Sequence, residues 1–237
     1  AGGDGGASAD IIRSAAGSGG AGIFLYDGGT LIVAGGLVRG GAGGSSPFLA
    51  GNAAAGVLSN LGQIRNAGTI SGGAAASTRE FYGRPGGVGI QAWGGTITND
   101  ATGLINGGEG GSTGYDSAAS VSGTGGAAVS FMAGQAASLV NAGRIHGGAG
   151  GDVYANSKVA GAGGVGIAGA ATGNISIINN GAIAGGMSND GKRANAIELA
   201  GSGNRLELQP GAIILGNVVV AEGGADNVLA LGGDGAT

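Results

Sequence analysis

One short motif that ends in a pair of glycines recurs along the whole chain. Its central aliphatic residue returns every 31 to 40 positions, by subtraction of residue numbers. This period is typical of a solenoid built from stacked repeats. The clearest copies read NAGTISGG at 66–73, NAGRIHGG at 141–148 and NNGAIAGG at 179–186. The central residues are Val38, Ile70, Ile105, Ile145, Ile183 and Ile214.

Two further aliphatic runs precede this motif in each repeat. The first runs include GIFL from Gly22 and GVGI from Gly164, and the second include 63–65 and 175–178. Short β-branched or aliphatic runs with a period near two indicate strands, and the dense glycine excludes helices. Three short strands and three turns per repeat predict an all-β parallel β-helix of about six coils. Asn66, Asn141 and Asn179 stand at the same place in their repeats and are expected to stack at one bend.

Composition excludes several other classes of protein. Glycine accounts for 62 of 237 residues, but with only 3 prolines and no strict three-residue repeat the chain is not collagen. A net charge of -4 offers no basic stripe for nucleic acid. The absence of cysteine excludes a disulfide framework. The longest aliphatic run, 212–221, is far below the ~20 residues of a membrane span, so we expect no membrane insertion of this segment.

Five glycine-rich insertions follow the glycine pairs. One coil needs only the residues from Gly22 to Gly41, so the rest of each repeat must lie in these insertions. If the coils stack in register, the insertions project from one edge of the rod. Coil residues are committed to stacking, so recognition is expected at this insertion edge and not on the rod itself.

The residues that could support chemistry are few and scattered. His146 is the single histidine, and other repeats have Ser71, Asn106 or Ala184 in its place, which indicates an exposed strand position. The glycines at 161, 163 and 166 match a nucleotide-binding pattern, but no helix follows to receive a phosphate. The carboxylates lie in different turns and insertions. We therefore expect no catalytic residues, no cofactor and no metal site.

Aromatic and basic residues gather in the insertions. Each aromatic ring could pin its own insertion against the rod, or the rings could form a row of contacts for a glycan or a protein. Arg79 is a further basic residue of the same region. The candidate partner contacts are Phe48, Phe81, Tyr82, Arg84, Tyr115, Tyr154 and Lys158.

The repeats and the closing segment NRLELQPGAIILGNVVVAEGGADNVLALGG at 204–233 resemble the passenger domain of a bacterial autotransporter, the type V secretion family. The likeness covers the chain from about Gly20 to its end. It implies a right-handed β-helix, export across two membranes, a location outside the cell or on the bacterial surface, and most often an adhesive role. This sequence departs from the family pattern in lacking the outer-membrane barrel.

We therefore expect a single β-helix over residues 1–237, with a flexible or capping segment at 1–20 and closing coils at 204–237. The expected function is adhesion, self-association or biofilm formation without catalysis. The partner would be a host or bacterial surface glycan or protein, or a second copy. Two alternatives remain open, namely an enzyme that cleaves polysaccharide and a structural filament subunit.

Overall fold

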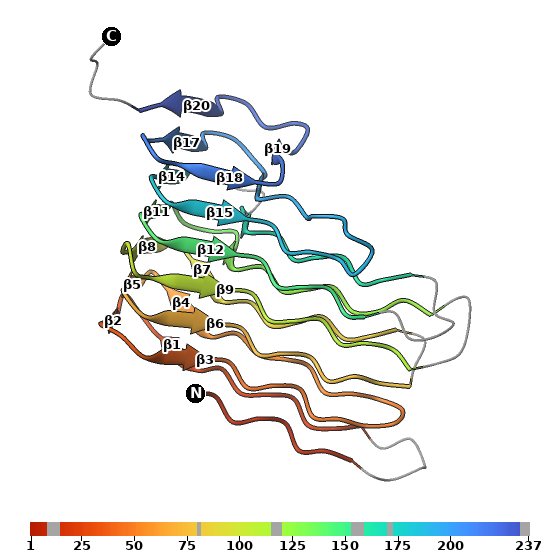
Figure 1. Ribbon diagram of the computed structural model, residues 1–237. Coiled ribbons are helices and arrows are strands. Elements are labelled where there is room, and N and C mark those ends of the chain that lie inside the picture. Colours follow the sequence, from red (N-terminus) through yellow and green to blue (C-terminus); the bar gives the residue numbers. More distant parts are fainter. Residues whose placement is uncertain (9–14, 80–81, 115–119, 153–158, 170–172, 233–237) are drawn as a thin grey trace.

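The computed structural model is all-β and consists of three parallel sheets stacked into a rod (Figure 1). It describes residues 1–8, 15–79, 82–114, 120–152, 159–169 and 173–232, and this part contains no helix. The first sheet contains β1 (Ile23–Leu25), β4 (Val57–Asn60), β7 (Ile90–Trp93), β10 (Val129–Phe131), β13 (Ile167–Ala168), β16 (Ile197–Leu199) and β19 (Val218–Val220).

The other two sheets contain the second and third strands of each coil. The second sheet contains β2 (Thr30–Val33), β5 (Gln63–Asn66), β8 (Gly95–Asn99), β11 (Ala137–Asn141), β14 (Ile175–Asn179), β17 (Arg205–Leu208) and β20 (Val228–Leu231). The third sheet contains β3 (Leu37–Arg39), β6 (Thr69–Ser71), β9 (Leu104–Asn106), β12 (Arg144–His146), β15 (Ala182–Ala184) and β18 (Ile213–Leu215).

Every strand pairs in parallel with the equivalent strand of a neighbouring coil. The stacked parallel arrangement predicted from the repeats is thus confirmed. The number of strands differs from the sequence interpretation, because two of the three sheets contain a seventh strand. These extra strands are β19 and β20, which pair with β16 and β17. Their residues continue the aliphatic pattern, but the glycine pairs at 223–224 and 232–233 do not follow the central valine or isoleucine that was used to count coils.

Alternation along each strand places one set of aliphatic side chains in the core. In β12, Ile145 is 1% exposed while Arg144 and His146 on either side of it are exposed. The predicted alternation of this strand, with His146 facing outward, is therefore confirmed. Burying each such side chain contributes ~1.5 to 3 kcal/mol. The interior column of the third sheet is Ile70, Ile105, Ile145 and Ile183, and that of the second is Ile64, Ile97, Leu139, Ile177 and Leu206.

The asparagines form a buried ladder along the rod. The Nδ2 of Asn66 donates to the Oδ1 of Asn99 at 2.8 Å, and that of Asn99 donates to Asn141 at 2.8 Å. Asn141 in turn donates to Asn179 at 2.7 Å. All four side chains are fully buried. The stack was expected, but its fourth member, Asn99, was not, because two extra residues separate it from Ile105.

The ladder residues do not have the left-handed backbone that asparagine tolerates at many bends. The described non-glycine residues with positive φ are Asp27, Leu61, Asn174 and Asp226. The ladder amides are used instead for hydrogen bonds, both to one another and to carbonyl groups at the following bend, such as that of Gly103. A buried amide must find such partners, since an unsatisfied one costs roughly 1 to 3 kcal/mol.

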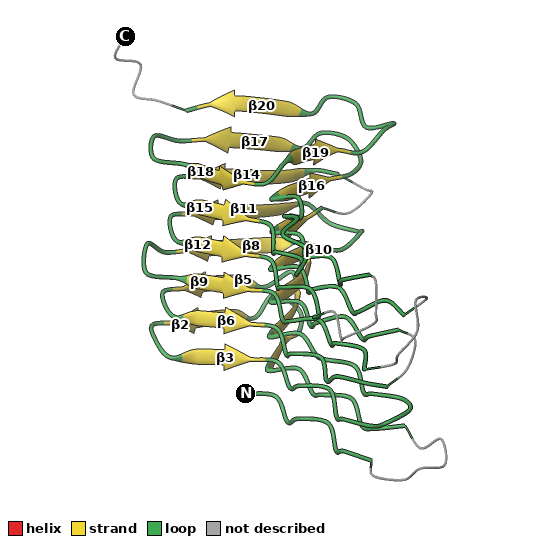
Figure 2. Ribbon diagram, turned by 45° about the vertical axis from the view of Figure 1, so that its right-hand side comes forward, coloured by secondary structure: helices red, strands yellow, loops and turns green. Residues whose placement is uncertain are grey.

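The insertions are not separate loops, because their ends form two hydrogen-bonded layers beside the rod (Figure 2). After each of the third-sheet strands from β3 to β15 the chain leaves the rod as an outgoing arm, and it comes back before the next first-sheet strand as a return arm. The N-terminal segment 2–8 lies in the place of a further outgoing arm, and 15–22 returns from it to β1. The outgoing arms are 2–8, 40–46, 72–78, 107–113, 147–152 and 185–188. The return arms are 15–22, 49–56, 82–89, 121–128, 159–166 and 192–196. We call the two layers together the slab.

Hydrogen bonds within a layer recur every third residue. In the outgoing layer the N–H groups of Gly2, Gly5 and Ser8 donate to the carbonyls of Arg39, Ala42 and Ser45. Three residues per turn is the period of the polyproline II helix, which has no internal hydrogen bonds and must bond to neighbouring chains. The arms therefore have an extended conformation with the three-residue period of polyproline II. This pattern also shows that the N-terminal segment 1–8 is a hydrogen-bonded outgoing arm.

Each glycine pair lies where the two layers meet. The N–H of Gly108 donates to the carbonyl of Gly87, and Gly108 accepts from the N–H of Gly126. A Cβ on Gly107 would lie 1.8 Å from the carbonyl oxygen of Gly126. A Cβ on Gly108 would lie 1.9 Å from that of Gly73, in the outgoing arm of the preceding coil. The first glycine thus faces the return layer, and the second faces the neighbouring outgoing arm.

Candidate interaction surface

The slab presents the third residue of every turn to solvent, since the other two face neighbouring arms. On the outgoing layer these outward positions form two rows that run along the rod. The row nearer the rod contains Asp4, Ala42, Ala74, Glu109, Ala149 and Met187. The row nearer the tips contains Ala7, Ser45, Ser77, Ser112 and Asp152. Asp4, Glu109 and Asp152 add carboxylates to this face, and Asp4 forms an ion pair of 3.6 Å with Arg39.

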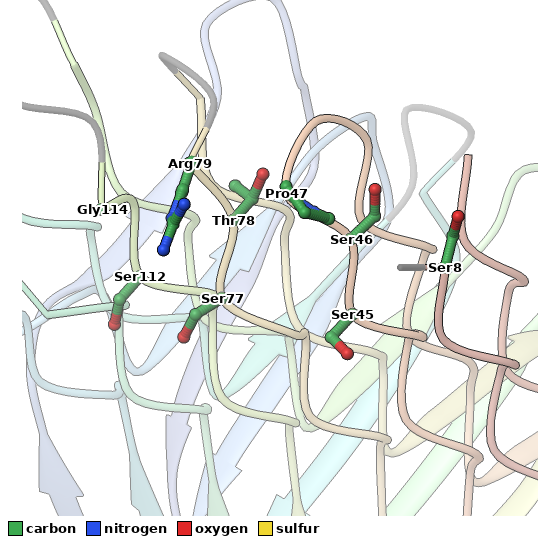
Figure 3. Close-up of a pocket in the computed structure, with 9 residues that line it drawn as sticks. All are labelled: Ser8, Ser45, Ser46, Pro47, Ser77, Thr78, Arg79, Ser112 and Gly114. Carbon is green, nitrogen blue, oxygen red and sulfur yellow. The ribbon is translucent and has the colours of Figure 1, made fainter. Parts of the chain in front are cut away.

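Serine side chains line a shallow groove of about 560 Å³ near the tips (Figure 3). Ser45, Ser77 and Ser112 come from three successive outgoing arms and point in the same direction. The next residues along these arms, Ser46 and Thr78, point the opposite way. Arg79 also lines the groove and adds a cationic group to it. The groove therefore combines hydroxyl groups with a positive charge.

Some of these hydroxyl groups hold the slab together. The Oγ of Ser112 accepts a hydrogen bond from the backbone N–H of Asp152 in the next arm, at 2.9 Å. The Oγ of Ser46 accepts from the backbone N–H groups of Phe48 and Leu49 and so shapes the tip of its own insertion. Ser45 and Ser77 are exposed. The serine row was missed in the sequence, although counting five residues from each first glycine would have revealed it.

Two of the predicted aromatic contacts are exposed on the slab. Phe48 is 41% exposed and Tyr82 is 69% exposed, so neither ring is pinned fully against the rod. Tyr82 begins a return arm and pairs with Val121, which pairs with Val159. The structure thus places Tyr82 in a row that runs along the slab. The predicted residues Phe81, Tyr115, Tyr154 and Lys158 lie outside the described part of the chain.

Arg84 aligns with a glycine in each of the two neighbouring return arms, namely Gly51 and Gly123. A Cβ on Gly123 would lie 1.9 Å from the carbonyl oxygen of Arg84, so this position is crowded. The Arg84 side chain is half-buried, and its Nε is buried without a hydrogen-bond partner. Arg84 therefore lies at the junction of the layers, whereas the sequence suggested a freely exposed contact.

The last insertion is short and ends in a charged turn. The carboxylate of Asp190 accepts hydrogen bonds from the Nζ of Lys192, at 2.7 Å, and from the Oγ of Ser188, at 2.5 Å. The side-chain hydrogen bond from Lys192 and then that from Ser188 lower the pKa of Asp190 to about 2. The same ion pair raises the pKa of Lys192. Both residues line a second groove of about 460 Å³ between this turn and the preceding return arm.

The remaining titratable groups are spread over the surface. Among the described residues no group of three or more His, Asp or Glu side chains could hold a metal ion together. Asp100 accepts a hydrogen bond from the Nε of Arg65 at 2.8 Å, between neighbouring coils. Within the described ranges, no helix has the length and apolar character needed to cross a membrane.

Comparison with known proteins finds no matching family model, no matching curated protein and no matching solved structure.

Proposed function

We propose that this chain is a non-catalytic passenger of the bacterial cell surface or a secreted passenger, and that it acts in adhesion, self-association or biofilm formation. We also propose that the rod is a right-handed β-helix. Both the function and the handedness rest on the proposed resemblance to autotransporter passengers. The proposed location is extracellular or on the cell surface. The partner is a surface glycan, a surface protein or a second copy of the chain.

The observation that carries the proposal is the slab. It widens the rod by two layers of backbone that hydrogen-bond to each other and along the rod, as between Gly87, Gly108 and Gly126. A solenoid needs only its three sheets to form a stacked core. The added layers bury few apolar side chains. They present rows of side chains at regular intervals on a flat support. Extended repetitive surfaces of this kind suit binding to other extended surfaces.

The experiment is an adhesion assay on cells that display the chain. We expect the double variant Phe48→Ser and Tyr82→Ser to reduce adhesion roughly tenfold, because exposed aromatic side chains supply much of the energy of an interface. Folding should persist, since neither ring is in the core. The matched control is His146→Ala, which changes an exposed side chain on the rod. Adhesion that survives the double variant at equal surface expression would count against the slab as the binding element.

A second assay addresses the enzymatic alternative. The chain would be incubated with a panel of acidic and neutral polysaccharides, and new reducing ends would be measured. We expect no release above that of the heat-denatured protein. Release that disappears on substituting Asp100 or Asp152 would replace the adhesive proposal with the polysaccharide-cleaving one.

A further inference from the structure

The return layer has an outer face that differs from the outgoing face in charge. We call it the return face and define it by three rows of outward residues. The row nearest the rod is Ala21, Ala55, Val88, Ala127, Val165 and Asn195. The middle row is Ser18, Asn52, Pro85, Thr124, Ala162 and Lys192, and the row at the tips is Ala15, Leu49, Tyr82, Val121 and Val159.

Of the residues in these rows, only Lys192 carries a charge. Every member of the middle row is exposed, and the flanking rows are half-buried or exposed. Protein interfaces differ from the rest of the protein surface in having few charged residues at their centre, and they do not differ from it in overall hydrophobicity. The outgoing face of the same slab contains Asp4, Glu109 and Asp152 and lacks this property. The two faces share one backbone geometry, so the difference lies in the side chains alone.

The side chains of the return face are mostly small and stand on a rigid support. Alanine or valine occupies every position of the row nearest the rod except the last. The backbone beneath is held from both sides, as when Gly125 donates to the carbonyl of Ala162 and Gly126 donates to that of Gly108. Little side-chain or backbone entropy is therefore left to lose when this face is covered.

We propose that the return face binds the return face of a second copy of this chain in a two-fold symmetric pair. Successive arms produce ridges ~4.8 Å apart along the rod, as parallel strands do. A surface with this period fits best against another with the same period, and a second copy supplies it. In a two-fold pair the same patch is used by both partners, so the contact closes on itself.

The size of the face meets the requirement of a specific interface. The face extends ~24 Å along the rod from its first coil to its last, at ~4.8 Å per coil. Its three rows are three residues apart, so it extends ~19 Å along the arms at ~3.1 Å per residue. With the side chains at the margins this is on the order of 600 Å² per copy, or ~1,200 Å² for the pair, the lower end of the range for specific complexes. Lys192 lies at one end of its row, away from the centre.

The inference deepens the proposed function by naming the partner, and its test is separate from adhesion. Sedimentation equilibrium on the purified chain, up to millimolar concentration, should show a reversible monomer–dimer equilibrium. Ala162→Glu should weaken dimerisation at least about tenfold, because the contact would have to bury a carboxylate in a face that is otherwise almost free of charge. Ala149→Glu is the matched control, since it makes the same change at an exposed position of the outgoing face. It should change the dissociation constant less than about threefold.

A second variant guards against an effect on folding. Thr124 is an exposed residue near the centre of the return face, and the chain contains no cysteine. Thr124→Cys should therefore give a covalent dimer with a short bismaleimide, while Ala149→Cys should not. A chain that stays monomeric at millimolar concentration would overturn the proposal, as would equal weakening by Ala162→Glu and Ala149→Glu. Failed adhesion with intact dimerisation would reject the adhesive function and leave this pairing in place.

Discussion

The carbonyl oxygen of Gly73 lies 1.9 Å from the point that a Cβ on Gly108 would occupy. The same relationship joins Gly108 to Gly148 and Gly148 to Gly186, each at 1.9 Å. No rotation of a side chain can relieve such a contact, because the obstructing atom belongs to the backbone. The outgoing layer can therefore stack in register only if each of these residues is glycine.

Gly108→Ala should loosen the slab, whereas Gly35→Ala should have little effect. A methyl group on Gly108 must push apart two arms, while a Cβ on Gly35 would meet nothing within 4 Å. Hydrogen exchange of the amides at 107–113 and 121–128 would report the loosening. We expect their protection to fall at least about tenfold in Gly108→Ala and to stay within about twofold in Gly35→Ala. Equal protection in the two variants would show that the layers are not closely packed.

Asn141→Ala should destabilise the rod by roughly 2 to 4 kcal/mol, since it breaks the buried ladder on both sides and takes one hydrogen-bond partner each from the buried amides of Asn99 and Asn179. Asn217→Ala is the control, because this exposed side chain makes a single hydrogen bond of 3.2 Å to Asn195. Its effect should stay within ~0.5 kcal/mol. Urea unfolding followed by circular dichroism measures both free energies. Similar values for the two variants would contradict a structural role for the ladder.

Ser59→Ala should stabilise the protein by roughly 1 kcal/mol, because it removes a buried hydroxyl that has no hydrogen-bond partner. The side chain is 1% exposed, and the residue aligned with it in the next coil is Ala92, so alanine suits this position. Ser130→Ala, at a half-buried outward position of the same sheet, serves as the comparison and should be close to neutral. A loss of stability in Ser59→Ala would show that its hydroxyl is satisfied in solution.

Ile145→Asp should lower the melting temperature far more than His146→Ala. An unpaired carboxylate in the core costs several kcal/mol, while truncation of an exposed side chain usually costs within ~0.5 kcal/mol. Differential scanning calorimetry distinguishes the two effects directly. Thermal shifts of comparable size would mean that the alternation of β12 is reversed in solution.

The pKa of Asp190 should be close to about 2 in an NMR titration and should rise toward its ordinary value of 3.8 in Lys192→Ala. The folded-state pKa is the lower one, so the stabilising contribution of this ion pair is fully present above pH 3.8. It is lost as the pH falls through about 2. Arg193→Ala is the control, since the described contact of that side chain is to the carbonyl of Gly185. An unchanged pKa in Lys192→Ala would exclude Lys192 as the main cause.

Local alternation and repeat spacing determined the rod. The interior column of Ile70, Ile105 and Ile145 could be read from the sequence because apolar side chains at alternate positions can be buried only if the strand places them on one side. The repeat period predicted that equivalent strands of successive coils lie one above another. The exposure of His146 followed from the same parity.

Only the tertiary structure showed what the glycine-rich insertions do. In sequence they appear as flexible loops, since glycine favours turns and each arm lacks internal hydrogen bonds. Their order comes from hydrogen bonds to arms of other coils, as from Gly108 to Gly87 and from Gly126 to Gly108. The addition of Asn99 to the ladder and the position of Arg84 between glycines likewise depend on which arms and coils become neighbours. Local sequence decides where a strand begins, but close packing between distant backbones decides where a Cβ cannot fit.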